Sequence, residues 1–142
     1  MGQGAGIMNL LQITKNHIGT PYNLGETDCF SWIVRYLTEQ GVELPKRYRG
    51  WTMETYKTLF TANPARANEL MIDFLDEHLK AINPAHAFSG DILLLELKKT
   101  TALSFLAIHG GNLTAIAASK EHGIGAIPLQ YYKKLRAWKC KR

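Results

Sequence analysis

Apolar residues recur at helical spacing through the first half of the chain. The pattern predicts amphipathic helices over residues 7–17, 29–40, 52–60 and about 65–82. Gly41 stands where a left-handed residue ends a helix, and Asn63-Pro64 separates the last two segments. The first half is therefore predicted to be helical.

The pattern changes after Pro84, where apolar runs replace the helical spacing. Residues 92–97, ILLLEL, predict a buried strand. Gly110-Gly111-Asn112 is a hairpin signal between strands predicted at 103–108 and 113–118, and shorter strands are predicted at 125–129 and 135–140. Helices followed by strands indicate an α+β fold, with N-terminal helices packed on an antiparallel β-sheet formed by the second half.

Length and composition fit one domain covering residues 1–142. The chain has 46% apolar and 20% charged residues, which are ordinary globular values that argue against disorder. No stretch approaches the ~18 apolar residues of a membrane-spanning helix. The start of the sequence lacks the pattern of a secretory signal, so we expect a cytoplasmic protein.

The positive charge is concentrated in the last part of the sequence. The net charge is +5, and the segment from Lys120 onward has seven basic residues against the single acid Glu121. Such an end could meet nucleic acid, an anionic cell-wall polymer or an acidic partner protein. A solvated basic edge that aids solubility is the commoner arrangement, and nucleic-acid binding rests on charge alone.

Cys29 stands at the first turn of a predicted helix, directly after a glycine-containing loop. Backbone N–H groups and the helix dipole at that position lower a thiol pKa and favour the nucleophilic thiolate. A cysteine nucleophile also needs a base, usually a histidine. On this chemistry alone Cys29 is either a nucleophile or a small buried core residue.

Residues 19–45, GTPYNLGETDCFSWIVRYLTEQGVELP, resemble the nucleophile segment of the NlpC superfamily of papain-like cell-wall cysteine peptidases. The matching positions are Gly19, Pro21, Tyr22, Gly25, Asp28, Cys29, Val34, Arg35, Gly41, Leu44 and Pro45. Ser89-Gly90-Asp91-Ile92 resembles the strand entry of the same superfamily. The ending GAIPLQYYKKLRAW is similar to that of its phage-tail and gene-transfer-agent branch.

This resemblance implies a papain-like NlpC-type domain that hydrolyses an amide of a peptidoglycan stem peptide. Cys29 would be the nucleophile, and Tyr22 and Asp28 would bind substrate. No cofactor is implied, and the scattered histidines and cysteines show no metal-ligand spacing. The implied partners are a peptidoglycan peptide or, in the phage-tail branch, tail proteins, with the protein carried in a phage or phage-like particle.

The sequence departs from the superfamily where the catalytic histidine is expected. Phe105, or Ser104 with a shift of one residue, occupies that position, and the third polar residue falls near Ala117. His109 is a substitute base only with a change of register, because it lies four residues, about 13 Å, further along the strand. His122 is on a loop. His17, His78 and His86 suit surface or helix-terminal roles.

Two functions follow from this departure. The first is a stem-peptide endopeptidase or amidase that is weakened or inactive for want of a base. The second is a non-catalytic binding or assembly module of the phage-tail type built on the same fold.

Overall fold

The structure is a computed structural model, and it describes residues 17–22, 29–98, 104–119 and 123–140. The helices are α2 (Cys29–Glu39), α3 (Met53–Ala62) and α4 (Pro64–His78). Thr52 begins α3 with a capping box to Thr55, and the Asn63 side chain accepts from the Arg66 N–H at the start of α4. Among the described residues, no helix is long and apolar enough to cross a membrane.

The second half forms one antiparallel sheet. Its strands are β1 (Ala81–Ile82), β2 (Ile92–Leu97), β3 (Phe105–His109), β4 (Thr114–Ser119), β5 (Gly123–Pro128) and β6 (Tyr132–Trp138). The described residues also include two 3₁₀ turns, η1 (Pro84–His86) and η2 (Leu129–Tyr131), and the sheet order is β1-β6-β2-β3-β4-β5. Helices followed by a six-stranded antiparallel sheet confirm the predicted α+β fold.

The predicted boundaries hold best where a turn residue marks them. The helix predicted from residue 29 begins there, and the strand predicted at 92–97 has those bounds. The helix predicted to reach residue 82 ends at His78, because residues 81 and 82 pair with β6 instead. The helix predicted over 7–17 lies outside the described residues except at His17, which is helical.

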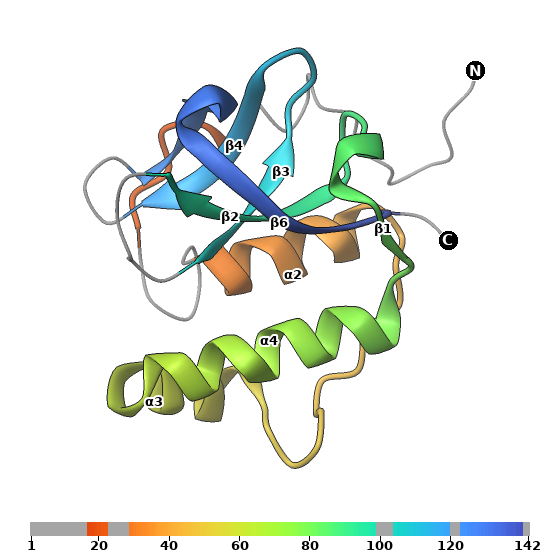
Figure 1. The fold of residues 1–142 in the computed structure, drawn as a ribbon. Coiled ribbons are helices and arrows are strands. Elements are labelled where there is room, and N and C mark those ends of the chain that lie inside the picture. Colours follow the sequence, from red (N-terminus) through yellow and green to blue (C-terminus); the bar gives the residue numbers. More distant parts are fainter. Residues whose placement is uncertain (1–16, 23–28, 99–103, 120–122, 141–142) are drawn as a thin grey trace.

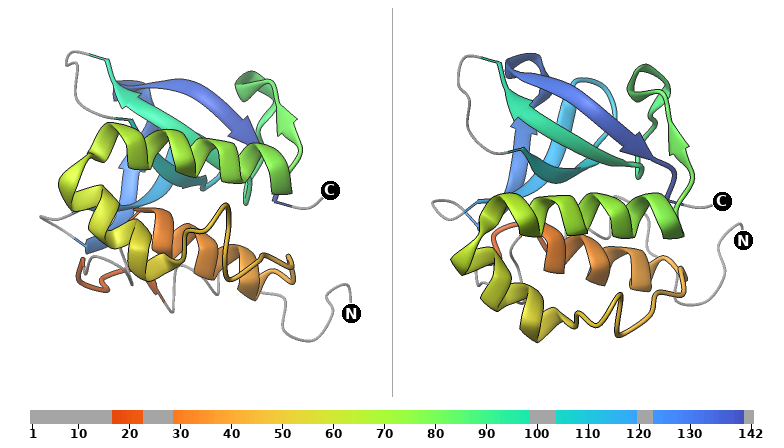
Figure 2. Two further views of the ribbon diagram at one scale, coloured as in Figure 1. Left: turned by 90° about the horizontal axis from the view of Figure 1, so that it is seen from below. Right: turned by 60° about the horizontal axis from the view of Figure 1, so that its bottom comes forward.

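The helices α2, α3 and α4 lie on one side of the sheet, as Figure 2 shows. The core between helices and sheet includes Trp32, Ile33 and Leu37 of α2, none of which is exposed. A second, smaller cluster lies on the opposite sheet face and consists of Leu93, Leu95, Ala107, Ala115, Ala117, Leu129 and Ala137. Because β2 and β3 are covered on both faces, their residues form continuous apolar runs.

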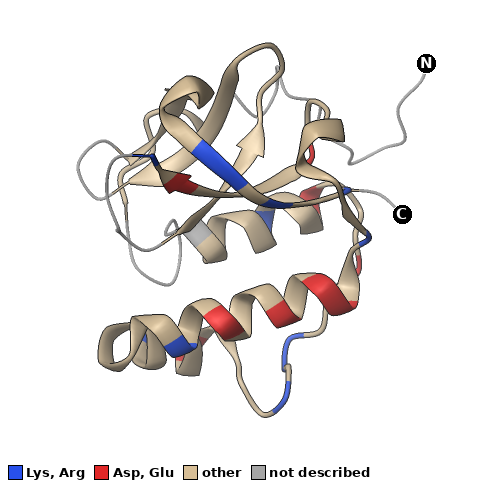
Figure 3. Ribbon diagram, in the orientation of Figure 1, with Lys and Arg blue, Asp and Glu red and all other residues tan. Residues whose placement is uncertain are grey.

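The basic residues of β6 do not all form a solvated edge. Figure 3 shows acidic residues along α4 and basic residues on β6. Arg136 donates to both carboxylate oxygens of Asp76 on α4, at 2.6 and 2.8 Å, and the Trp138 Nε1–H donates to the same carboxylate at 2.9 Å. One of the C-terminal basic residues, Arg136, therefore links α4 to the sheet through an ion pair.

Candidate functional site

The candidate nucleophile stands at the start of α2. Cys29 is the first residue of this helix, which confirms the prediction that it lies in a first turn. The helix packs against β3 and β4, and Figure 1 shows it running beneath the sheet. Asp28 and the side chain of Cys29 lie outside the described residues. The backbone places Cys29 at the N-terminus of α2. The N–H groups and the dipole of a helix N-terminus favour the thiolate form of a cysteine.

The segment that carries Tyr22 is held at the edge of the sheet by backbone hydrogen bonds to β5. The Gly19 N–H donates to the Ile124 carbonyl at 2.8 Å, and the Ile124 N–H donates to the Thr20 carbonyl at 2.9 Å. Gly123 has a φ of +69°, and a Cβ there would lie only 2.2 Å from the Thr20 carbonyl oxygen. A glycine is therefore required for this close approach, which places the half-buried Tyr22 beside the helices.

A pocket of about 220 Å³, which we call the groove pocket, lies between α3, α4 and the ends of β3 and β4. It is lined by Tyr22, Tyr56, Phe60, Pro64, Asn68, Met71, Ser104, Phe105, Ala118 and Ser119. The Tyr56 ring packs on the ring of Phe30, the second residue of α2, with centroids 4.8 Å apart. The groove pocket therefore lies one side chain away from the start of α2, and it contains the predicted substrate-binding residue Tyr22.

The polar groups in this pocket form a bonded pair. Asn68 of α4 donates from its Nδ2 to the Ser104 Oγ at 3.0 Å. Both side chains are partly buried, and most of the remaining lining is apolar. A few polar groups in an apolar pocket are typical of sites that orient a ligand by hydrogen bonds.

The two positions considered for the base have side chains on opposite faces of the sheet. Ser104 precedes β3 and bonds to α4, so its side chain is on the helix side. The Phe105 ring packs edge-on against Tyr132, with centroids 5.5 Å apart, and belongs to the cluster on the opposite face. Phe105 also lines the groove pocket, although its ring packs on the opposite face. The position that faces the helices is thus occupied by a serine.

The position considered for the third polar residue is apolar on either face of β4. Ala117 lies in the cluster away from the helices, and its neighbour Ala118 lies on the helix side and lines the groove pocket. An alanine at both positions offers no group that could orient an imidazole.

His109 ends β3 at the opposite end of the sheet from Ser104. It is buried, and its Nδ1 accepts a hydrogen bond from the Gly111 N–H at 3.0 Å. Burial and the Lys134 ammonium lower the pKa of His109, and Asp91 partly offsets this shift. The ring is therefore held in its neutral form, with Nδ1 engaged in the hairpin turn.

The remaining described histidines also lie away from the groove pocket. The buried His17 binds Glu39 through Nε2 at 3.1 Å and accepts from the Trp32 Nε1–H at 3.4 Å. His78 ends α4, and its Nδ1 lies 2.9 Å from the Phe74 carbonyl oxygen. His86 is exposed in η1, and His122 lies outside the described residues. Helix-terminal positions for His17 and His78 and a surface position for His86 agree with the prediction.

Cys140, the second cysteine, is buried and forms no disulfide. This confirms the prediction that no disulfide joins it to Cys29. Its backbone N–H donates to the Asp91 carboxylate at 3.3 Å. Burial first, and then Cys140, raises the pKa of Tyr36, whose hydroxyl donates to the Gly90 carbonyl at 2.7 Å. These groups connect α2 to the start of β2, and none of them lines the groove pocket.

Solved structures of NlpC/P60 proteins share this α+β fold. A NlpC/P60 family protein from Bacillus cereus is 16% identical, with a TM-score of 0.57 over 94% of this chain. The NlpC/p60 domain of the peptidoglycan hydrolase SagA is 20% identical, with a TM-score of 0.56 over 96% of this chain. An NLP/P60 family protein from Staphylococcus aureus is 13% identical, with a TM-score of 0.56 over 99%.

The chain spans 39% and 45% of the Bacillus and Staphylococcus proteins and 98% of the SagA domain. No curated protein matches it. The family whose model matches, over residues 8–140, is described as "Domain of unknown function (DUF6950)", and the chain belongs to this family.

Asn68 is a polar residue of the groove pocket that sequence analysis missed. In the sequence it is an ordinary polar position on a helix, 36 residues before Ser104. Only the packing of α4 on the sheet brings the two side chains together, so no local pattern could have indicated the pair.

Proposed function

We propose that this protein binds a cell-wall stem peptide in the groove pocket and cleaves its amide bond slowly or not at all. The bond concerned is the one between γ-D-glutamate and the diamino acid, which the resemblance of residues 19–45 implies. The NlpC/P60 fold and the domain of a peptidoglycan hydrolase that the chain matches along almost its whole length support the substrate class.

One observation carries the catalytic part of this proposal. Among the described residues that line the groove pocket there is no histidine, and Ser104 with Asn68 occupies the helix side of β3. A hydroxyl and a neutral amide neither accept nor release a proton near pH 7. Amide hydrolysis requires a general acid, because the leaving amine must be protonated as the tetrahedral intermediate collapses. The helix N-terminus can ionise a thiol, but it cannot supply that proton.

The same pair is suited to binding. Asn68 donates to Ser104 through Nδ2, which leaves its Oδ1 as an acceptor for a peptide N–H. Tyr22 and Tyr56 contribute aromatic rings to the lining of the same pocket. A peptide backbone has the alternating N–H and C=O groups that such a pocket can satisfy.

Calorimetric titration with the tripeptide L-Ala-γ-D-Glu-meso-diaminopimelate tests this function. Cys29→Ala serves as the parent protein, so that turnover cannot consume the peptide. We expect saturable binding, weakened about fivefold by Asn68→Ala, since one peptide hydrogen bond contributes roughly 1 kcal/mol. Arg66→Ala, an exposed change on the same helix, is the control and should bind as the parent does. Equal affinity of the Asn68 and Arg66 variants would place the peptide elsewhere.

A second candidate function is a non-catalytic assembly module of the phage-tail type. It is favoured by two exposed apolar side chains, Phe88 at 69% and Leu113 at 71% exposure, at the end of the sheet away from the groove pocket. Such side chains commonly mark protein contacts when they lie together. This function predicts no stem-peptide binding at 5 mM, so the same titration separates the two candidates.

A further inference from the structure

The polar pair of the groove pocket keeps hydrogen-bonding capacity for a ligand. Asn68 uses one amide N–H for the Ser104 Oγ, at 3.0 Å. Among the described residues, no other partner engages the second N–H of Asn68, its Oδ1 or the Ser104 O–H. An amide and a hydroxyl are uncharged near pH 7, and together they both donate and accept. The pair therefore offers donors and an acceptor, but no charge.

No charged side chain lines the groove pocket within the part of the chain that the structure describes. The cation closest to Asn68 in the sequence is Arg66, which is exposed and pairs with Glu69 at 3.2 Å. A carboxylate that enters the pocket would therefore lose water without gaining a cation from this lining. Burial of a charge without a partner of opposite sign is strongly unfavourable.

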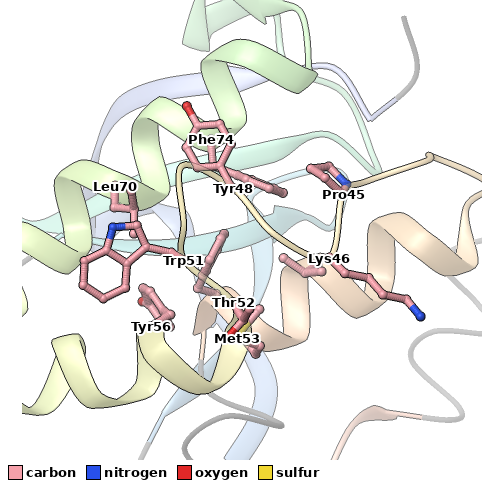
Figure 4. Close-up of a pocket in the computed structure, with 11 residues that line it drawn as sticks. Pro45, Lys46, Tyr48, Trp51, Thr52, Met53, Tyr56, Leu70 and Phe74 are labelled. Carbon is pink, nitrogen blue, oxygen red and sulfur yellow. The ribbon is translucent and has the colours of Figure 1, made fainter.

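The Tyr56 wall of the groove pocket is backed by other rings. Tyr56 packs on Phe30, and Phe30 packs on Phe74 with centroids 5.5 Å apart. Beyond Tyr56 lies a second space of only about 50 Å³, which Lys46 also lines (Figure 4). In Figure 4 the Lys46 ammonium group points away from Tyr56, so this lysine offers no cation to the groove pocket.

The volume of the groove pocket limits how much of a stem peptide it can hold. At about 220 Å³ it exceeds the roughly 150 Å³ of a cavity that accommodates benzene, but it is smaller than the roughly 300 Å³ of a pocket for a drug-sized molecule. It therefore takes one planar group of the peptide and its neighbouring atoms. The γ-linked D-glutamate carries such a group, because its α-carboxyl branches from the chain either as a carboxylate or as a carboxamide.

We propose that the groove pocket selects stem peptides in which the α-carboxyl of D-glutamate is amidated. This inference rests on the proposed function, because it concerns the same pocket and peptide. A carboxamide donates an N–H to the Asn68 Oδ1 and accepts from the remaining donors of Asn68 and Ser104. A carboxylate of the same shape accepts those bonds, but it sets a negative charge against Oδ1 and has no cation beside it.

Calorimetric titration with two peptides tests this selection on the Cys29→Ala protein. L-Ala-γ-D-Glu-meso-diaminopimelate and L-Ala-D-isoglutaminyl-meso-diaminopimelate differ only at this group. At pH 7.5 we expect the amidated peptide to bind at least about tenfold more tightly. If neither peptide binds saturably at 5 mM, the proposed function and this inference fail together. Equal affinities, or tighter binding of the acid, leave the proposed function standing and overturn the inference.

Two variants at one position test whether charge causes the selection. Asn68→Lys supplies a cation, and Asn68→Asp places a negative charge in a side chain of nearly the same size. We expect Asn68→Lys to abolish or reverse the preference for the amide, and Asn68→Asp to increase it, because aspartate repels the acid and still accepts the carboxamide N–H. Arg66→Ala, an exposed change on the same helix, should keep the parent's preference.

Circular dichroism shows whether each variant is folded, and Asn68→Asp alone decides if Asn68→Lys does not fold. A preference that stays at the parent's value in the folded variants would overturn the inference, since the charge at residue 68 would then not set the selection.

Discussion

The two ends of the sheet differ in how they use polar groups. At the end where β3 begins, Asn68 and Ser104 form a neutral pair in an open pocket. At the end where β3 finishes, Asp91 and His109 are ionisable, but both are buried and bonded to turn backbone. The comparison teaches that a histidine in the right strand does not make a catalytic site. Whether the histidine can act as a base depends on its position along the strand and on the hydrogen bonds that its ring nitrogens already form.

Hydrogen bonds within the turns engage the polar groups of Asp91 and His109 at the end where β3 finishes. The Asp91 carboxylate accepts from the Phe88 N–H at 2.9 Å and from the Cys140 N–H at 3.3 Å. The Gly90 N–H donates to the His109 carbonyl, and the His109 N–H donates to the Asp91 carbonyl, both at 2.8 Å. These bonds join two turns and the end of β6. We therefore expect changes at this end to affect stability and changes at the other end to affect function.

The largest effect is expected from Asp91→Ala. Two backbone N–H groups lose their acceptor, one of them buried, which should lower the free energy of unfolding by about 3 kcal/mol. Urea denaturation measures the change. Glu69→Ala is the control, because this exposed carboxylate forms a surface ion pair with Arg66 and its loss should change stability by less than about 0.5 kcal/mol. A loss below 1 kcal/mol for Asp91→Ala would mean that the turns do not depend on its carboxylate.

A matched pair of variants sharpens the comparison at the open end. Ser104→His places an imidazole on the helix side of β3, and Phe105→His places one on the opposite face. An imidazolium near the thiol lowers its pKa. We expect Ser104→His to raise the rate at which iodoacetamide alkylates Cys29 at pH 6 about tenfold, and Phe105→His to leave this rate near the wild-type value. Mass spectrometry separates Cys29 from the buried Cys140.

If Phe105→His raises the alkylation rate and Ser104→His does not, the base position is Phe105. The face of β3 that carries Phe105, rather than the face that carries Ser104, would then be the one near the Cys29 thiol.

The smallest effect concerns pH. Because folding lowers the pKa of His109, the neutral ring stabilises the folded state fully above the unfolded pKa of about 6.5. That contribution is lost as the pH falls below this value toward the folded pKa. Unfolding in urea at pH 7.5 and 5.5 should therefore show a smaller loss of stability on acidification for His109→Asn than for the wild type. An equal loss in both proteins would show that His109 contributes nothing to the acid sensitivity.

The sequence predicts the fold well where turns and continuous apolar runs mark it. Residues 92–97 and the Gly110-Gly111-Asn112 hairpin needed no tertiary information, and Cys29 begins its helix as expected. The strand at Ala81–Ile82 could not be predicted, because two residues carry no periodicity and the strand exists only by pairing with β6.

The candidate site was predictable only in part, for a physical reason. Leu106, Ala107 and Ile108 are all 0% exposed, because the sheet is covered on both faces. A strand of this kind has no alternation of apolar and polar positions, so its sequence does not show which side chain faces the helices. The choice between Ser104 and Phe105 therefore required the contacts of Asn68 and Tyr132.

The most direct test of the central claim is the rate at which the purified protein hydrolyses the stem peptide L-Ala-γ-D-Glu-meso-diaminopimelate, followed by chromatography beside Cys29→Ala. Loss of general acid–base assistance typically costs 10² to 10⁴-fold in rate. We therefore predict turnover at or below about 10⁻² s⁻¹, with the peptide still bound. Turnover near 1 s⁻¹, a usual enzyme rate, that disappears in Cys29→Ala would contradict the account. A base would then act on Cys29, and His109 and His122 would be the first residues to replace.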